Sequence, residues 1–165
     1  LLIQAAAQLV KARPDVHFLI MGFPGEEGYR AYAHSLGLAD HVTFTGKIPY
    51  QLAPRYLAVG DVAVSTKISA TEGSGKLLNY MALGLPTVTF DTPVSHEYLG
   101  DWGVYAEKGN PVALAEALGF VLEDGGRAAT LGAGLRQRAI GRYSWEQAGR
   151  QIMGIYDALG RQQRI

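Results

Sequence analysis

Short apolar runs alternate with helical stretches along this chain, and that alternation limits its fold more than any other feature. Five runs contain almost no charged residues: 17–22, 41–46, 61–65, 86–90 and 103–106. Nearly continuous apolar runs of this length are typical of strands that are covered on both faces. Strands that alternate with helices connect through right-handed crossovers. The pattern therefore predicts an α/β fold, a Rossmann-like doubly wound parallel sheet with helices on both faces.

Helix start and stop signals occupy the segments between the runs. Asn110 and Pro111 supply an N-cap and a first-turn proline, and Ser144 with Gln147 forms a capping-box pattern. Glycine and proline close the helices. The signals predict helices over 26–36, 54–59, 74–83 and 111–123, and two further helices that finish the chain.

The length and the first helix bear on domain organisation. A chain of 165 residues with 48% hydrophobic residues can fill one core, so we expect a single domain over 1–165. Leu2, Ala5, Ala6 and Leu9 recur at helical spacing before any strand. Units of this kind begin with a strand, so we expect that the first strand is missing and that the chain is part of a larger protein.

Composition excludes several classes of function. The 15 Lys+Arg balance the 15 Asp+Glu, so the chain lacks the basic excess of a nucleic-acid-binding protein. It has no cysteine, which excludes a disulfide framework, thiol catalysis and thiolate metal sites and fits a cytoplasmic location. No apolar stretch is long enough to predict a membrane span.

Charge is unevenly distributed along the chain. Residues 1–124 carry a net charge of −5, whereas seven arginines after position 124 stand against Glu146 and Asp157, a net charge of +5. Solvated faces of the terminal helices account for this asymmetry without a partner. Alternatively, the arginine-rich end docks on another acidic domain or on an anionic membrane, with peripheral contact at its inner face.

The loop from Ser65 to Gly75 is the longest and most polar loop at the carboxyl ends of the predicted strands, where open parallel sheets bind ligands. Gly73 and Gly75 let a ligand approach the backbone, and Ser74 can cap the helix that follows. The first amides of that helix attract anions. Lys76 adds a positive charge where the helix dipole is already positive, which favours a bound anion. The loop predicts a phosphate site; a capped helix with an exposed lysine is the alternative.

Two other phosphate signatures do not fit the sequence. A Walker A loop would need glycine at position 70 and Ser or Thr at position 77, where Ala70 and Leu77 stand. Gly22, Gly25 and Gly28 lack the spacing of a dinucleotide fingerprint. Gly22 instead ends its strand in a turn that leaves room for a ligand.

Histidine and tryptophan contribute few candidates. His96 is the one histidine expected at the ligand edge, and no metal-spaced pair occurs, so we expect no metal ion. Trp102 and Trp145 are expected in the core rather than as ligand platforms.

Six segments occur in a familiar order: FLIMGFPGEEGYRAYAHSLGL, ADHVTFTGKIP, YLAVGDVAVS, GSGKLLNYMALGLPTVTFDTP, HEYLGDWGVYAEKGNPVALAEAL and YSWEQAGRQIMGIYDAL. Together they resemble the C-terminal, nucleotide-sugar-binding domain of GT-B glycosyltransferases, specifically the retaining glycosyltransferase family 4. The run from Met81 to Pro86 is the most specific of the matches. The resemblance implies donor binding for sugar transfer from a nucleoside-diphosphate sugar to a glycan, lipid-linked or small-molecule acceptor, without cofactor or metal.

The resemblance also implies roles for individual residues. The backbone around Gly46, Lys47 and Ile48 would contact the base, and the amides from Ser74 to Leu77 would hold the distal phosphate. Lys76 and those amides would stabilise the departing diphosphate. The donor-binding set implied in this way is completed by Gly22, Gly73, Gly75 and Asn79.

The glutamate motif departs from the family pattern. The family carries two glutamates eight positions apart, the first for the donor sugar and the second for the ribose hydroxyls. Asn79 stands at the second position, and an ungapped count puts the first on Thr71, one residue before Glu72. Glu72 is the implied sugar contact, and Asn79 can still hydrogen-bond a hydroxyl.

The resemblance further implies an N-terminal domain that binds the acceptor and forms the other wall of the cleft. The chain alone is then expected to bind nucleotide weakly and not to transfer sugar. Two alternatives stay open. One is half of a sugar-nucleotide epimerase, and the other is a non-catalytic nucleotide-binding or interaction module, which the replaced glutamate supports.

Overall fold

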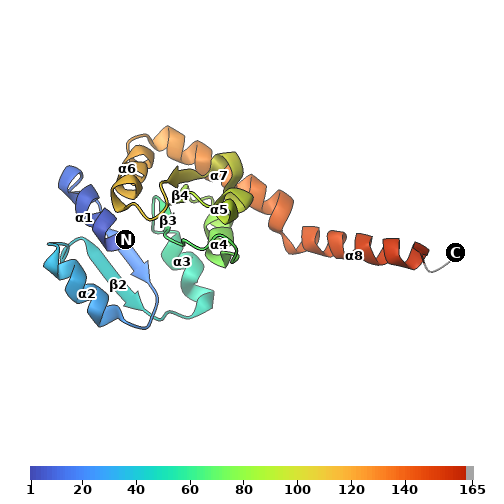
Figure 1. The fold of residues 1–165 in the computed structure, drawn as a ribbon, viewed down its shortest axis with the longest axis horizontal. Helices are drawn as coiled ribbons and strands as arrows, with labels where there is room; N and C mark the ends of the chain where they lie inside the picture. Colours follow the sequence, from blue (N-terminus) through green and yellow to red (C-terminus); the bar gives the residue numbers. More distant parts are fainter. Residues whose placement is uncertain (163–165) are drawn as a thin grey trace.

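Five short strands pair only in parallel in the computed structural model, which describes residues 1–162 (Figure 1). The strands β1 (Phe18–Met21) and β2 (Val42–Gly46) form one sheet. A second sheet has β4 (Thr87–Phe90) between β3 (Ala63–Ser65) and β5 (Val104–Ala106). The α/β class and the parallel pairing are confirmed. The five strands nevertheless form two sheets rather than one, because within residues 1–162 no hydrogen-bonded ladder joins them.

The predicted helices form in the segments that their start and stop signals indicate. Asn110 Oδ1 accepts hydrogen bonds from the amides of Val112 and Ala113, and Gly84 ends its helix with a φ of 69°. The helices are α1 (Leu2–Ala12), α2 (Glu26–Ser35), η1 (Tyr50–Leu52), α3 (Ala53–Leu57), α4 (Gly75–Leu83), α5 (Pro93–Leu99), η2 (Gly100–Trp102), α6 (Pro111–Leu122), α7 (Gly125–Tyr143) and α8 (Trp145–Gln162).

One of these helices, α5, is not among those that the sequence predicted. Thr92 accepts a hydrogen bond from the amide of Ser95, and Pro93 occupies the first helical position. Both are ordinary helix-start signals, so the helix follows from local sequence.

Two apolar clusters hold these elements together. The larger one includes residues of both sheets, of α1 and of α6, which lie side by side in Figure 1. The second packs Leu77 and Met81 of α4 against Leu99 of α5 and Leu135 of α7. Since Leu77 and Met81 are fully buried, this cluster fixes the position of α4.

Two arginines of α7 hold neighbouring helices in place through hydrogen bonds to their backbone carbonyls. Arg138 donates to the carbonyls of Tyr98 at 2.7 Å and Glu97 at 2.9 Å, and the Tyr143 hydroxyl donates to the same Glu97 carbonyl. Arg127 donates to the carbonyl of Phe120. Part of the basic excess after residue 124 therefore ties α7 to α5 and α6.

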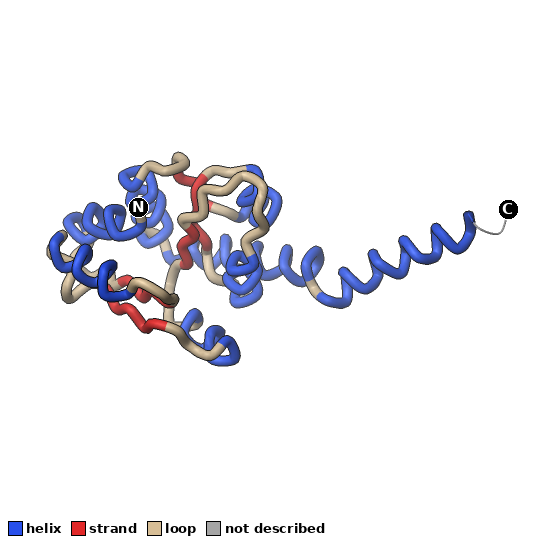
Figure 2. Tube along the Cα trace, turned by 60° about the horizontal axis from the view of Figure 1, so that its bottom comes forward, coloured by secondary structure: helices blue, strands red, loops and turns tan. Residues whose placement is uncertain are grey.

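The last helix extends away from the rest of the molecule (Figures 1 and 2). Its apolar side chains are exposed, and Trp145 is 93% exposed. The expectation that Trp145 lies in the core is wrong, because no described element covers this face of α8. Within residues 1–162, no helix combines the length and apolar character that crossing a membrane requires.

Candidate functional site

The loops after β1 and β2 are joined at the carboxyl edge of their sheet. The amide of Gly22 donates to the carbonyl of Gly46 at 3.2 Å. The Lys47 ammonium group lies 4.9 Å from the centroid of the Phe23 ring, within range of a cation–π interaction. The predicted base-contacting segment is therefore held against the turn that contains Gly22. Ile48, the last residue of that segment, is half-buried.

Glycine is required at the end of β2 and leaves space at the end of β1. Gly46 has a φ of 67°, and a Cβ there would lie 3.2 Å from Oε1 of Glu26. Nothing lies within 4 Å of a Cβ built on Gly22. The turn at Gly22 therefore leaves open space, as its sequence predicts.

The first turn of α4 has free backbone donors. The amide of Leu77 donates to the carbonyl of Ser74 at 2.9 Å. Within residues 1–162, the amides of Ser74, Gly75 and Lys76 have no such partner. The amide of Leu77 is thus removed from the predicted phosphate-binding set, and its side chain is core. The other three amides remain available.

A buried serine lies at each end of the loop between β3 and α4. Ser65 is 1% exposed and Ser74 is 5% exposed, and within the described chain neither Oγ has a hydrogen-bond partner. The expectation that the Ser74 side chain caps α4 is wrong, because its Oγ accepts from no amide of the first turn. Burial of a hydroxyl without a hydrogen-bond partner costs free energy. A ligand atom that hydrogen-bonds one of these hydroxyls would remove that cost. Ser65 was not predicted as a site residue.

One lysine lies in this loop and a second in the first turn of α4. Lys67 Nζ donates to the carbonyl of Gly73 at 2.8 Å and lies 3.2 Å from Glu72 Oε2. Lys76 is exposed, yet partial desolvation lowers its pKa, and the charge of Lys67 lowers it further. Two neighbouring ammonium groups beside free amides favour a bound anion. Lys67 was missed by sequence reasoning; its place in the same polar loop was the only signal.

The carboxylate of Glu72 is turned toward Lys67. Ser69 Oγ accepts from the amides of Thr71 at 3.5 Å and Glu72 at 3.2 Å, which folds the loop back on itself. The Glu72 side chain is 74% exposed. Its contact with a sugar stays a prediction.

Asn79 and Gly73 are each approached by a tyrosine. The Tyr50 hydroxyl, in η1, lies 3.5 Å from Asn79 Oδ1 and can donate to it. This contact joins the loop after β2 to α4. Gly73 lies close to Tyr98 of α5, whose hydroxyl would be 3.2 Å from a Cβ at position 73.

His96 is held beside this edge by two neighbours. Its Nε2 lies 2.8 Å from Oδ1 of Asp91, and its ring stacks on Tyr105 with 3.9 Å between centroids. Burial raises the pKa of Tyr105 to about 12, so this ring partner is neutral at physiological pH. Within residues 1–162, the structure brings together no set of three or more His, Asp or Glu side chains suited to a metal ion.

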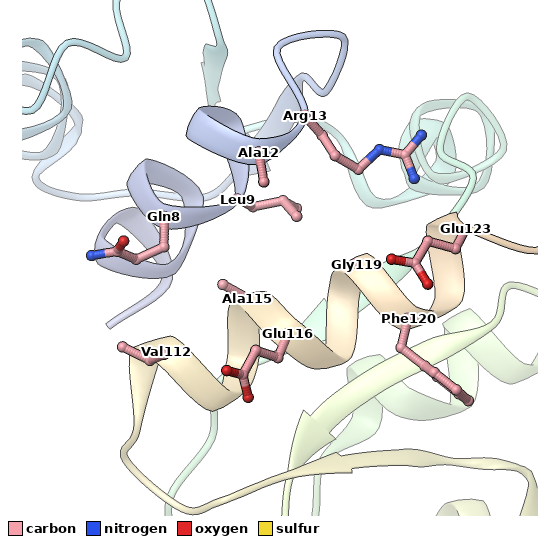
Figure 3. A pocket seen from close by; sticks show the side chains of 10 residues that line it. All are labelled: Gln8, Leu9, Ala12, Arg13, Val112, Ala115, Glu116, Gly119, Phe120 and Glu123. Atoms are coloured by element: carbon pink, nitrogen blue, oxygen red, sulfur yellow. The ribbon is translucent and has the colours of Figure 1, made fainter.

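A separate groove lies between α1 and α6 (Figure 3). It encloses about 440 Å³ over an apolar floor that includes Leu9 and Ala115. Arg13 and Glu123 lie at one end of it, and the Arg13 guanidinium is 3.4 Å from Asp15. The groove contains none of the predicted site residues, and its one cation already has a counter-ion.

A family model described as glycosyl transferases group 1 matches residues 1–124. The chain is 29% identical over 161 residues to a GDP-mannose-dependent alpha-(1-6)-phosphatidylinositol monomannoside mannosyltransferase from Mycolicibacterium smegmatis, covering 92% of this chain and 42% of that protein. It is 31% identical over 173 residues to a D-inositol 3-phosphate glycosyltransferase from Corynebacterium urealyticum, covering 96% of this chain and 39% of that protein.

Solved structures share the fold. Sucrose-phosphate synthase from Thermosynechococcus elongatus superposes with a TM-score of 0.83 at 22% identity, over 97% of this chain and 42% of that one. Anabaena HepE in complex with UDP gives a TM-score of 0.82 at 24% identity, over 95% and 44%. The chain thus spans less than half the length of each of these proteins.

Proposed function

The chain belongs to the glycosyl transferases group 1 family of GT-B glycosyltransferases, and on that premise we propose that it is the donor-binding domain of a retaining glycosyltransferase. It holds a nucleoside-diphosphate sugar. The sugar passes to a glycan, a lipid-linked acceptor or a small molecule.

The proposal rests on one observation: the first turn of α4 carries hydrogen-bond donors and positive charge suited to an anion, and no group of the described chain satisfies these donors. The amides of Ser74, Gly75 and Lys76 and the buried hydroxyl of Ser74 lack partners within the described chain, while Lys67 and Lys76 supply positive charge. A diphosphate offers several acceptor oxygens and negative charge to such a group.

The transfer reaction also requires stabilisation of negative charge at the first turn of α4. When the bond between the sugar and the distal phosphate breaks, negative charge develops on the departing diphosphate. Preorganised donors that face this charge lower the barrier. In this proposal Lys76 and the amides of α4 meet the charge, and neither a metal ion nor a cofactor takes part.

The remaining donor contacts come from the loop after β2, in the first sheet, and from α4, which follows β3 of the second sheet. The backbone of Gly46, Lys47 and Ile48 contacts the base, and Asn79 hydrogen-bonds a ribose hydroxyl. The approach of Tyr50 to Asn79 supports this division, because it brings the base loop to the face of α4 that carries Asn79. Glu72 addresses the donor sugar.

The proposal includes a second domain that binds the acceptor. The curated relatives named above are more than twice as long as the part this chain matches, since it covers 42% and 39% of them. Closure of two domains would complete the site. In this proposal the 165-residue chain binds nucleotide without transferring sugar.

Peripheral contact with the inner face of a membrane forms a further part of the proposal. The relative from Mycolicibacterium smegmatis carries phosphatidylinositol monomannoside, a lipid-linked mannoside, in its name. The helix α8 presents Ile152, Ile155, Tyr156 and Leu159, all exposed, along one stripe. Arg150 on the opposite face pairs with Glu146 at 2.9 Å. Burial of the apolar stripe, rather than attraction of this arginine, would therefore drive such contact.

Calorimetric titration of the chain with UDP, GDP and ADP tests the proposal. We expect one of them to bind, and Lys76→Ala to weaken binding about tenfold by removing a charge-assisted contact. Lys11→Ala, on α1, is the matched control and should bind as the unmodified chain does. If none of the three binds, donor binding is refuted and the chain is better described as an interaction module.

A further inference from the structure

Lys67 supplies positive charge beside the proposed phosphate site, and its own contacts indicate a more specific role. Its ammonium group donates to the carbonyl of Gly73 at 2.8 Å. Gly73 immediately precedes Ser74, the N-cap residue of α4, and Lys76 lies in the first turn of the same helix. The side chain of Lys67 therefore reaches back across its own loop to the start of α4.

Within this loop Lys67 is half-buried, whereas its counter-ion is exposed. The hydrogen bonds from the amides of Thr71 and Glu72 to Ser69 Oγ turn the chain back. The Lys67 side chain is 28% exposed, whereas its ion-pair partner Glu72 is 74% exposed. The ammonium group thus has one backbone partner, the Gly73 carbonyl, and one exposed side-chain partner, the Glu72 carboxylate.

This asymmetry makes the two contacts of Lys67 unequal. An exposed carboxylate in an ion pair gains little over its contacts with water, so it can be displaced easily. The contact with the Gly73 carbonyl keeps the ammonium group in place when the carboxylate leaves. A phosphate group brings more charge and more acceptor oxygens than a carboxylate, so it competes well for the same ammonium group.

We propose that Lys67 and Lys76 together form a paired-lysine receptor for the terminal phosphate of a diphosphate, and that Glu72 occupies Lys67 until that phosphate arrives. This inference rests on the proposed function and adds to it a coupling between two events. Arrival of the phosphate releases the carboxylate of Glu72. The released carboxylate is then free to turn toward the sugar that follows the phosphate.

The electrostatics of the empty loop agree with this arrangement. Partial desolvation and the neighbouring Lys67 both lower the pKa of Lys76, so the two ammonium groups disfavour each other without an anion. Glu72 neutralises only one of them. A phosphate that contacts both would remove the repulsion.

Titration with inorganic pyrophosphate and with UDP tests the receptor, because neither probe contains a sugar. We expect Lys67→Met to weaken pyrophosphate binding about tenfold. Glu72→Gln should strengthen it about threefold, since it removes a weak internal competitor. In the double variant the gain from Glu72→Gln should vanish, because it acts through Lys67.

Matched variants separate charge from general effects. Lys67→Arg keeps the charge and should retain most of the affinity, while Lys11→Met and Glu116→Gln change the same charges on α1 and α6 and should have no effect. Glu72 is exposed, so Glu72→Gln tests the inference even if Lys67→Met fails to fold.

Two results would overturn the inference while leaving the proposed function intact. One is pyrophosphate binding that depends on Lys76 but not on Lys67. The other is an unchanged or weakened affinity in Glu72→Gln, as expected if Glu72 contacts only the sugar or the fold. If the unmodified chain binds neither pyrophosphate nor any nucleoside diphosphate, the proposed function fails as well.

Discussion

Gly132 of α7 faces the carbonyl of Gly84 so closely that a Cβ at position 132 would overlap it. This contact lies at the end of α4, the helix whose first turn carries the proposed phosphate site. The position of that turn therefore depends on a glycine far from it in the chain.

Gly132→Ala is expected to destabilise the protein. The added methyl group must displace the end of α4, and overpacking of this kind costs about 1–3 kcal/mol. Gly141→Ala is the matched control on the same helix, because nothing lies within 4 Å of a Cβ there. It should be neutral or stabilising by up to about 1 kcal/mol. Urea unfolding followed by circular dichroism measures both, and equal effects of the two variants would contradict the packing argument.

Removal of the Lys76 charge is expected to stabilise the chain at pH 7 while it weakens anion binding. The folded state lowers the pKa of this ammonium group, so its charged form is disfavoured on folding at any pH below that lowered value. As the pH rises from the lowered pKa toward 10.5, the penalty in the unmodified chain disappears. Because Lys76 is exposed and solvent screens its charge, Lys76→Met should raise the free energy of unfolding only slightly at pH 7, with a smaller gain near pH 10. A loss of stability at pH 7 would show that the ammonium group makes favourable contacts in the empty protein.

Asn110→Ala is expected to lower the free energy of unfolding by about 1 kcal/mol, because it removes the acceptor for two amides of α6. Asn110→Ser keeps an acceptor oxygen and, unlike aspartate, places no carboxylate beside Glu107, so it should retain most of the stability. Thermal and urea unfolding of the pair provide the comparison; a loss of the same size in both would contradict the view that the acceptor oxygen at position 110 stabilises α6.

Membrane contact through α8 is expected to depend on its apolar stripe. The double variant Ile152→Gln/Ile155→Gln should reduce flotation with vesicles that contain phosphatidylinositol. Arg150→Gln, on the opposite face, should leave flotation largely unchanged. If the unmodified chain does not float with these vesicles, the membrane part of the proposal is refuted.

The sequence predicted the elements well because their signals are local. The apolar runs marked all five strands, and Asn110 marked the start of α6. The helix α5 was missed although Thr92 and Pro93 carried the signals for it. Pairing of the strands into two sheets is a non-local property, which no periodicity encodes.

The candidate site was predicted at the level of its loop but not of its contacts. The type of residue at position 74 suggested a helix cap, whereas its hydroxyl is left without a partner. Lys67 with Gly73 and Tyr50 with Asn79 meet only because the chain folds back on itself. The exposure of Trp145 was likewise not predictable from local sequence. An apolar stripe on a helix is buried only where another element covers it.

The central claim is that the free amides at the start of α4 bind a diphosphate, and amide chemical shifts measured by nuclear magnetic resonance test it most directly. On titration with whichever of UDP, GDP and ADP binds, the account predicts large shifts for the amides of Ser74, Gly75 and Lys76. The matching nucleoside without phosphates should leave these three amides unchanged. Binding of the nucleoside diphosphate with no response at these positions would contradict the account.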